Sequence, residues 1–135
     1  KNDKLNALAQ GEPIFDPSKM VAFYDEKGIL RLSLKIDNLI FIEAADNYVN
    51  IHYYNKEKIS KFMLRNSLKK LEETFVNSEI LRCHRSYMVN FEKVKIIRKD
   101  KDGLKLELDL PSTLDIPVSK SYVDSVMQTF SKYCQ

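Results

Sequence analysis

Period-two alternation of apolar and polar side chains is the pattern that most constrains the fold of this chain. Residues 29–36 place four apolar side chains on one side and Arg31, Ser33 and Lys35 on the other, which is typical of a strand with one buried face. Residues 39–45 are almost wholly apolar and rich in β-formers, which predicts a strand covered on both faces. A chain of 135 residues fits one such domain.

Further strands are predicted wherever short polar turns separate alternating runs. These are a strand at 21–25, two hairpins at 49–54 with 58–64 and at 93–98 with 104–108, and a last strand at 114–118, which Pro117 places at a sheet edge. Residues 76–92 interrupt the strand pattern. The order contains no βαβ alternation, so the predicted sheets are antiparallel.

Two helices complete the prediction. Leu64, Leu68, Leu71 and Phe75 recur at helical spacing, which indicates a helix over 67–75 that Asn66 or Ser67 caps. A terminal helix begins near Ser121, where Ser121 and Asp124 have the spacing of a capping box. The predicted fold class is mainly β with two short α-helices, in several small antiparallel sheets.

The ends of the chain differ in composition from its middle. Residues 1–19 are polar, contain Gly and Pro and have no period, so we interpret them as a linker from a missing N-terminal region. The folded domain is predicted at 20–131 and a tail at 132–135. Two cysteines and the absence of a long apolar run favour a cytoplasmic domain, and an anchor in the missing region is left open.

Positive charge is concentrated in one part of the sequence. Residues 82–101 carry seven basic and two acidic side chains, whereas the whole chain has a net charge of +3. A single basic surface of this kind is expected for a protein that binds a polyanion. A strand pair whose lysines face water explains the same pattern, so charge alone does not decide.

Catalytic and metal-binding patterns are missing. His84, Arg85, Ser86 and Asn90 superficially resemble a protein-kinase catalytic loop, but Ser86 stands where the catalytic Asp belongs and no Gly-rich loop accompanies it. His52, His84 and Cys83 lack a metal-ligand spacing. We therefore predict no enzymatic activity, no metal and no cofactor, and a structural, hydrogen-bonded role for His84.

Binding is better supported, because three segments offer donors for phosphates and base edges: 46–48, 82–86 and 119–121. Lys120 lies near a predicted helix N-terminus, where a cation is disfavoured and a bound phosphate is favoured. The alternative is a lysine that points into water.

Cys83 lies between Arg82 and Arg85, a setting that would favour its thiolate and make it redox-sensitive. The alternative is an inert thiol that points into the core.

Four segments of the chain, in order, resemble the LytTR family of bacterial DNA-binding domains. They are residues 41–49 (FIEAADNYV), 64–72 (LRNSLKKLE), 82–90 (RCHRSYMVN) and 116–122 (IPVSKSY). The resemblance implies small antiparallel sheets, two helices, and loops that enter successive major grooves at promoter direct repeats. It also implies a homodimer on paired sites and a missing receiver or membrane-sensor region.

The resemblance further implies site residues. Base contacts are expected from Asn47, Tyr48, Arg85 and Lys120, although a lysine lacks the fork that reads guanine with two bonds. Phosphate contacts are assigned to Ser86, Lys93, Lys99, Ser119 and Ser121. The predicted function is sequence-specific binding of double-stranded DNA by a transcriptional regulator.

Two alternatives remain open from the residues alone. They are an RNA-binding module and a protein-interaction module, either of which would use the aromatic face formed by Tyr48, His52 and Tyr54.

Overall fold

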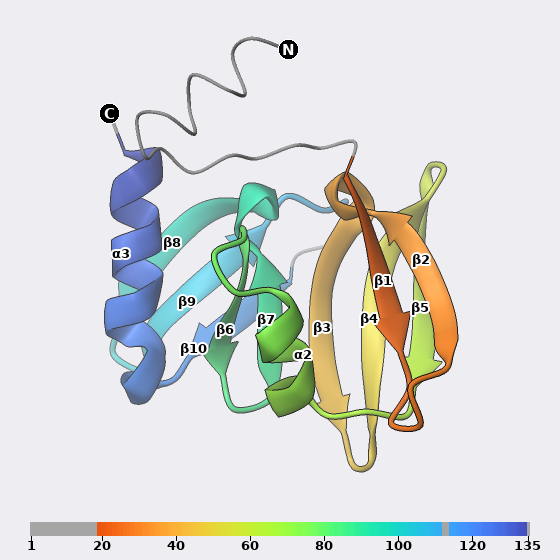
Figure 1. Cartoon of the computed structure of the whole chain (residues 1–135). Coiled ribbons are helices and arrows are strands. Elements are labelled where there is room, and N and C mark those ends of the chain that lie inside the picture. The colour runs from red at the N-terminus through yellow and green to blue at the C-terminus, as the bar shows by residue number, and fades with distance from the viewer. Residues whose placement is uncertain (1–18, 112–113, 135) are drawn as a thin grey trace, which may run out of the picture.

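The computed structural model describes residues 19–111 and 114–134, and within them the chain forms three antiparallel sheets and two helices (Figure 1). The strands are β1 (Met20–Tyr24), β2 (Leu30–Lys35), β3 (Leu39–Ala45), β4 (Tyr48–Asn55), β5 (Lys58–Leu64), β6 (Ile80–His84), β7 (Tyr87–Asn90), β8 (Val94–Asp100), β9 (Gly103–Leu108) and β10 (Asp115–Val118). The helices are α2 (Leu68–Thr74) and α3 (Val123–Tyr133), with 3-10 turns η1 (Ile36–Asn38), η2 (Phe91–Lys93) and η3 (Lys120–Tyr122). The predicted fold class is confirmed.

The largest sheet has the order β5-β4-β3-β7-β6, and it is joined by the sheets β10-β9-β8 and β1-β2. Figure 1 shows the two-stranded sheet on the side of β4 and β5, and the three-stranded sheet with α3 on the side of β6 and β7. Pro117 lies in β10, an edge strand, as predicted.

Strand β3 is buried on both faces, as its apolar run predicts. Leu39 and Ile42 belong to the core beneath β1, β2 and α2, whereas Ile40 and Phe41 belong to the core shared with β8 to β10 and α3. The pairing of β3 with β4 shifts register between Leu39 and Phe41. This irregularity lets two consecutive side chains enter the same core, which regular alternation forbids.

Helix α2 forms where its apolar spacing and its cap predict it. The Ser67 hydroxyl accepts a hydrogen bond from the Lys70 N–H at 3.2 Å, which satisfies one of the free donors of the first turn. Leu68 and Leu71 are buried, and Phe75, just after the helix, packs against Phe23 with ring centroids 5.9 Å apart.

Three predictions are corrected. Residues 76–92 do not simply interrupt the sheet, because they contain the hairpin of β6 and β7. Ser121 does not cap α3: it lies inside η3, and the helix begins after Tyr122 without a side-chain cap. Helix α3 also continues to Tyr133, two residues into the predicted tail. The predicted linker lies almost wholly outside the described residues.

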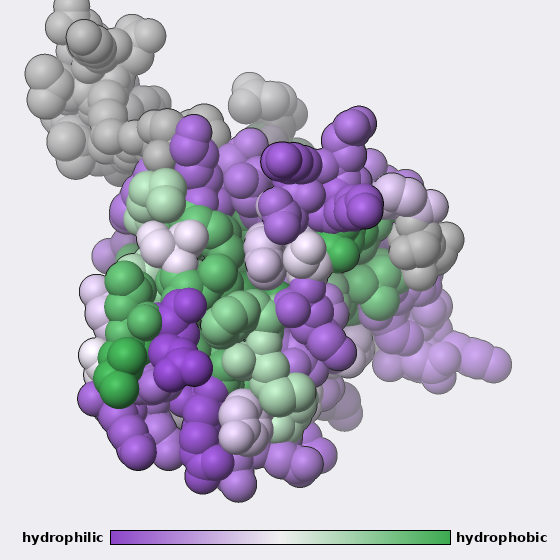
Figure 2. Space-filling model, turned by 90° about the vertical axis from the view of Figure 1, so that its right-hand side faces the viewer, coloured by the Kyte–Doolittle hydropathy of each residue, from purple (hydrophilic) through white to green (hydrophobic). Residues whose placement is uncertain are grey.

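The side of the molecule formed by β2 and β5 exposes apolar side chains. Leu30, Ile59 and Met63 are each more than two-fifths exposed, and Figure 2 shows apolar surface on this side, bordered by hydrophilic side chains. Ile29 and Met63 line a hollow beside Arg65. No helix among the described residues is long and apolar enough to cross a membrane.

Asn90 fixes the entry to β3 from the end of β7. Its buried amide donates to the carbonyl oxygens of Ile36 at 3.2 Å and Leu39 at 2.7 Å, and its side-chain oxygen accepts from the Glu92 N–H at 3.0 Å. We expect Asn90→Ala to lower the free energy of unfolding by about 2–4 kcal/mol, because it removes all three hydrogen bonds of a buried amide.

Urea denaturation of Asn90→Ala measures this loss, and Asn55→Ala is the matched control because Asn55 is exposed at the end of β4. The control should change stability by less than about 0.5 kcal/mol. Equal stability of the two variants would contradict the role given to Asn90.

Candidate nucleic-acid interface

Three loops that are distant in sequence meet at one edge of the molecule. They are Asp46 and Asn47 between β3 and β4, Arg85 and Ser86 between β6 and β7, and Ser119 between β10 and η3. The Ala44 N–H donates to the Ser86 carbonyl at 2.9 Å, and the Ser119 N–H donates to the Cys83 carbonyl at 3.0 Å. These bonds tie the loops into one surface, which forms the lower edge in Figure 1.

The side chains of this three-loop edge differ in exposure. Asn47, Arg85, Lys120 and Ser121 are exposed, whereas Ser86 is half-buried. Within the described residues, Arg85 and Lys120 have no carboxylate within 4 Å, so their charges are available to an outside anion. Asp46 has φ of 57°, a left-handed conformation that Asp tolerates better than most residues.

Ser119 contributes to the edge through its backbone. Its hydroxyl oxygen is buried and has no hydrogen-bond partner among the described residues, while its N–H is bonded to Cys83. The residue thus fixes the chain immediately before Lys120.

Arg82 holds the β6–β7 turn in place, a role that the sequence did not indicate. Its Nε donates to the His84 carbonyl at 3.0 Å and its Nη2 to the Arg85 carbonyl at 2.8 Å. Its Nη1 donates to Glu72 of α2 at 2.8 Å, and the guanidinium lies 5.8 Å from the ring centroid of Tyr122 in η3. The partners are backbone groups and remote side chains, so no local pattern in the sequence could have identified this arrangement.

His84 has the structural role predicted for it. Its Nδ1 accepts a hydrogen bond from the Ser86 N–H at 3.0 Å, which requires a neutral ring with that nitrogen unprotonated. Partial burial lowers the pKa of His84, and the charges of Arg85 and Arg82 lower it further. The neutral form therefore stabilises the turn that presents Arg85.

Tyr48 lies at the same edge but is half-buried. The Arg65 guanidinium is 5.4 Å from the centroid of its ring, and Arg65 Nη1 donates to the Tyr48 hydroxyl at 3.5 Å. Tyr48 thus supports a neighbouring cation.

The two lysines assigned to phosphates lie in different places. Lys93 is in η2, at the opposite end of β7 from the β6–β7 turn, and its Nζ lies 3.5 Å from Asp37. Lys99 of β8 pairs with Leu104, which pairs with Val118, so Lys99 lies two strands from the start of the third loop. Lys99 flanks the three-loop edge and Lys93 does not.

The interpretation of residues 82–101 as one basic surface is wrong. Four of the seven basic side chains pair with carboxylates of other segments: Arg82 with Glu72, Lys93 with Asp37, Lys95 with Glu107, and Arg98 with Asp115. These pairs neutralise most of the local charge. Arg85, Lys99 and Lys101 are the members without such a partner among the described residues.

The aromatic face considered for RNA or protein binding is largely occupied by internal contacts. His52 stacks on Phe41 with ring centroids 4.1 Å apart, and its Nε2 lies 2.8 Å from Glu43. Tyr54 packs against the second core, and Lys93 Nζ lies 5.8 Å from its ring centroid. These contacts do not favour a platform on which bases stack. The described residues also contain no cluster of three or more potential metal ligands.

Comparison with known proteins gives a consistent result. A family model described as the LytTr DNA-binding domain matches residues 31–131. The chain is 36% identical over 97 residues to the transcriptional regulatory protein BtsR of Escherichia coli K12, covering 70% of this chain and 37% of that protein. It is 25% identical over 124 residues to an uncharacterized response regulatory protein of Vibrio cholerae, covering 89% of this chain and 46% of that protein.

Among solved structures, a LytTr DNA-binding domain from Bacillus cereus matches with a TM-score of 0.60 and 23% identity, over 82% of this chain and 95% of that one. At this identity the match shows the fold. The chain spans less than half the length of the two curated relatives above.

Cys83 is not an activated thiol. It is fully buried in the second core, and burial raises its pKa to about 12. Its Sγ lies 3.7 Å from the Tyr87 carbonyl. The hypothesis of a redox-sensitive thiolate is therefore wrong, because the desolvation of the thiolate outweighs the charge of Arg82.

We expect a thiol reagent at pH 8 to label exposed Cys134 at least tenfold faster than Cys83 in the folded protein. Mass spectrometry of the labelled chain distinguishes the two sites. In denaturant both should react at similar rates, which is the control, and equal rates in the folded protein would contradict the burial of Cys83.

Proposed function

Because the chain belongs to the LytTr DNA-binding domain family, we propose that its three-loop edge reads a specific sequence in double-stranded DNA. The observation that carries this proposal is the pair of backbone hydrogen bonds that joins the three loops, with Asn47, Arg85 and Lys120 exposed along them. Loops fixed in this way present their donors without a large loss of conformational freedom on binding.

Each residue of the three-loop edge has a distinct role in this proposal. Arg85 has the planar fork that donates two hydrogen bonds to guanine, and Asn47 has the amide that pairs with adenine. Lys120 supplies a point charge to guanine or phosphate, and Tyr48 contacts the duplex at the rim of its ring. Ser86, Ser121 and Lys99 contact phosphates. Ser119 acts by fixing the position of Lys120, and Lys93 takes no part.

Strand spacing sets the width of the contact. Five adjacent strands about 4.8 Å apart span roughly 19 Å, and β10 adds to this on the side of β6. The pitch of B-DNA is about 34 Å, so three loops spread over this width enter one major groove and reach toward the next one. In this proposal the domain uses these successive grooves to bind promoter direct repeats.

The assembly of the whole protein is also part of the proposal. The chain spans less than half of relatives named as a response regulatory protein and a transcriptional regulatory protein. A receiver or membrane-sensor region then precedes this domain, and two copies occupy paired sites on DNA in the cytoplasm.

We expect Arg85→Ala to weaken binding to a preferred duplex by about 1–3 kcal/mol and to have little effect on a random duplex, because a base contact is lost. The preferred duplex is first selected from random sequences, and fluorescence anisotropy at one salt concentration gives both affinities. Lys58→Ala is the control, since Lys58 is exposed at the opposite end of β5 from Leu64 and should change neither affinity.

Equal losses on the two duplexes would reduce Arg85 to a phosphate contact. Single-stranded RNA that displaces the preferred duplex would reject DNA reading in favour of an RNA-binding module.

Arg82→Lys should lower the affinity for the preferred duplex by about 1–2 kcal/mol, because an ammonium group cannot bond both turn carbonyls and Glu72 in the same geometry. Affinity for a random duplex and its salt dependence should stay unchanged, because the charge is kept. Anisotropy measurements test this, with thermal unfolding as a check on folding. A matching loss on both duplexes would contradict a positioning role for Arg82.

A further inference from the structure

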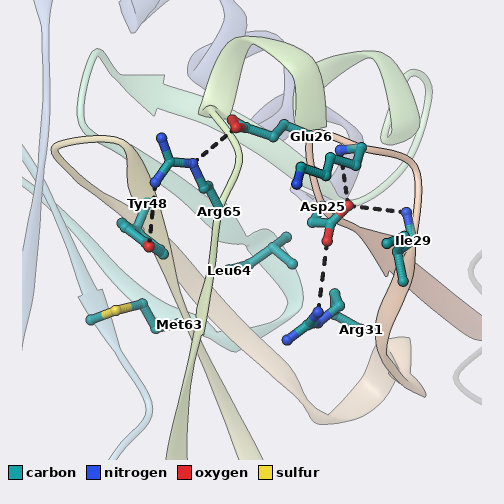
Figure 3. A pocket seen from close by; sticks show the side chains of 9 residues that line it. Asp25, Glu26, Ile29, Arg31, Tyr48, Met63, Leu64 and Arg65 are labelled. Atoms are coloured by element: carbon teal, nitrogen blue, oxygen red, sulfur yellow. Dashed lines mark hydrogen bonds and ion pairs between the residues drawn. The ribbon is translucent and has the colours of Figure 1, made fainter.

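A hollow of about 520 Å³ opens beside the three-loop edge, where the β1–β2 turn meets the end of β5 (Figure 3). Its polar lining comes from Asp25, Glu26, Lys27, Arg31, Tyr48 and Arg65. Figure 3 shows Arg31 and Arg65 on two sides of this hollow, with Leu64 between them. Two guanidinium groups therefore border one open, partly apolar depression.

Arg65 is held in a fixed orientation. Its Nε donates to Glu26 at 2.9 Å, its guanidinium lies over the Tyr48 ring, and its carbonyl accepts from the Glu26 N–H at 2.9 Å. Half of the side chain nevertheless remains exposed. A guanidinium that is oriented and still exposed is suited to bind a further anion.

Arg31 is held much more loosely. Its ion pair with Asp25 is 3.8 Å long, and more than half of its side chain is exposed. Asp25 itself accepts hydrogen bonds from the backbone N–H groups of Lys27 and Ile29, at 2.9 and 3.0 Å. Both of those bonds go to Oδ1, whereas Arg31 Nη1 faces Oδ2 at a distance too long for a hydrogen bond. The donors of the Arg31 guanidinium therefore stay open to an outside partner.

The hollow is continuous with the three-loop edge. Tyr48 directly follows Asp46 and Asn47, and its neighbour Val49 pairs with Leu64, the residue before Arg65. In Figure 1 the β1–β2 turn lies beside the β3–β4 loop along the lower edge. A duplex lying across the three loops would therefore bring its backbone over Arg65 and Arg31.

We infer that Arg31 and Arg65 form a phosphate site for the backbone of the duplex that the three loops read. This inference rests on the proposed function and extends the DNA-binding surface onto the β1–β2 hairpin. Guanidinium groups match phosphate geometry with paired donors. The open shape and mixed charge of the hollow suit one segment of a continuous backbone rather than an enclosed small anion.

Glu26 is expected to weaken the binding of phosphate at this site. Its carboxylate competes with phosphate for Arg65, since both accept hydrogen bonds from the same guanidinium. Removing that charge should therefore strengthen DNA binding.

The test compares Arg31→Gln, Arg65→Gln and Glu26→Gln with Lys58→Gln as a matched control for charge. Affinities for the preferred and a random duplex are measured over a range of salt concentrations. Arg31→Gln and Arg65→Gln should each weaken both duplexes by the same factor, and each should reduce the slope of log K against log salt by about 1. Glu26→Gln should raise both affinities severalfold at low salt, and Lys58→Gln should change neither slope nor affinity.

Unchanged slopes in Arg31→Gln and Arg65→Gln would overturn the inference, as would an affinity that does not rise in Glu26→Gln. Inorganic phosphate or a mononucleotide that binds as tightly as the duplex would overturn it in favour of a small-anion site. If Arg65→Gln fails the thermal-unfolding check, Arg31→Gln decides the matter alone. The proposed function fails separately, when the unmodified chain prefers no duplex sequence.

Discussion

Burial of β3 on both faces is the constraint on which the rest of the structure depends. Leu39 and Ile42 need one cover and Ile40 and Phe41 another, so two cores must form around one strand. The β1–β2 sheet with α2 supplies the first cover, and the three-stranded sheet with α3 supplies the second. Each cover combines a small sheet with a short helix and would be only marginally stable alone. The shared strand β3 joins the two covers into one cooperative unit.

This arrangement also positions the candidate site. β3 is in the centre of the five-stranded sheet, so its end and the neighbouring β6–β7 turn lie at the same edge, and the bond between Ala44 and Ser86 fixes their spacing. The second cover brings β10 against β6, where Ser119 bonds to Cys83. The cores that stabilise the fold thus bring together the three-loop edge, the candidate binding surface, from loops up to about 70 residues apart in sequence, and Arg82 restrains the β6–β7 turn from within the protein.

Where the apolar side chains recur with a regular period, the sequence predicts the strand or helix, and where pairing is irregular it does not. Helix α2, with Ser67 at its start, follows from local sequence because helical spacing and burial agree there. The alternation of residues 29–36 also located β2, but within that strand only Leu34 is buried and Leu30 stays exposed, so the predicted buried face is formed only in part. β6 and β7 were missed because β6 has a register shift after Arg82 and β7 runs directly into buried Phe91, which erases the period of two. The charge of residues 82–101 was misjudged because its acidic partners, among them Asp37 and Glu72, come from segments far away in sequence. The same limit applies to Cys83, whose basic neighbours were visible but whose burial was not.

The ion pairs that were invisible in the sequence shape what this domain does with DNA. Nonspecific affinity rises with the number of phosphates that cations neutralise, and the carboxylates paired with Arg82, Lys93, Lys95 and Arg98 offset part of the charge that these four cations would supply. With a net charge of only +3, the chain retains little general attraction for a polyanion. Discrimination depends on the ratio of specific to nonspecific binding. If Arg85 and Lys120 contact bases as proposed, a weakly charged surface with a few unpaired donors would give each of these contacts more influence over where the protein binds.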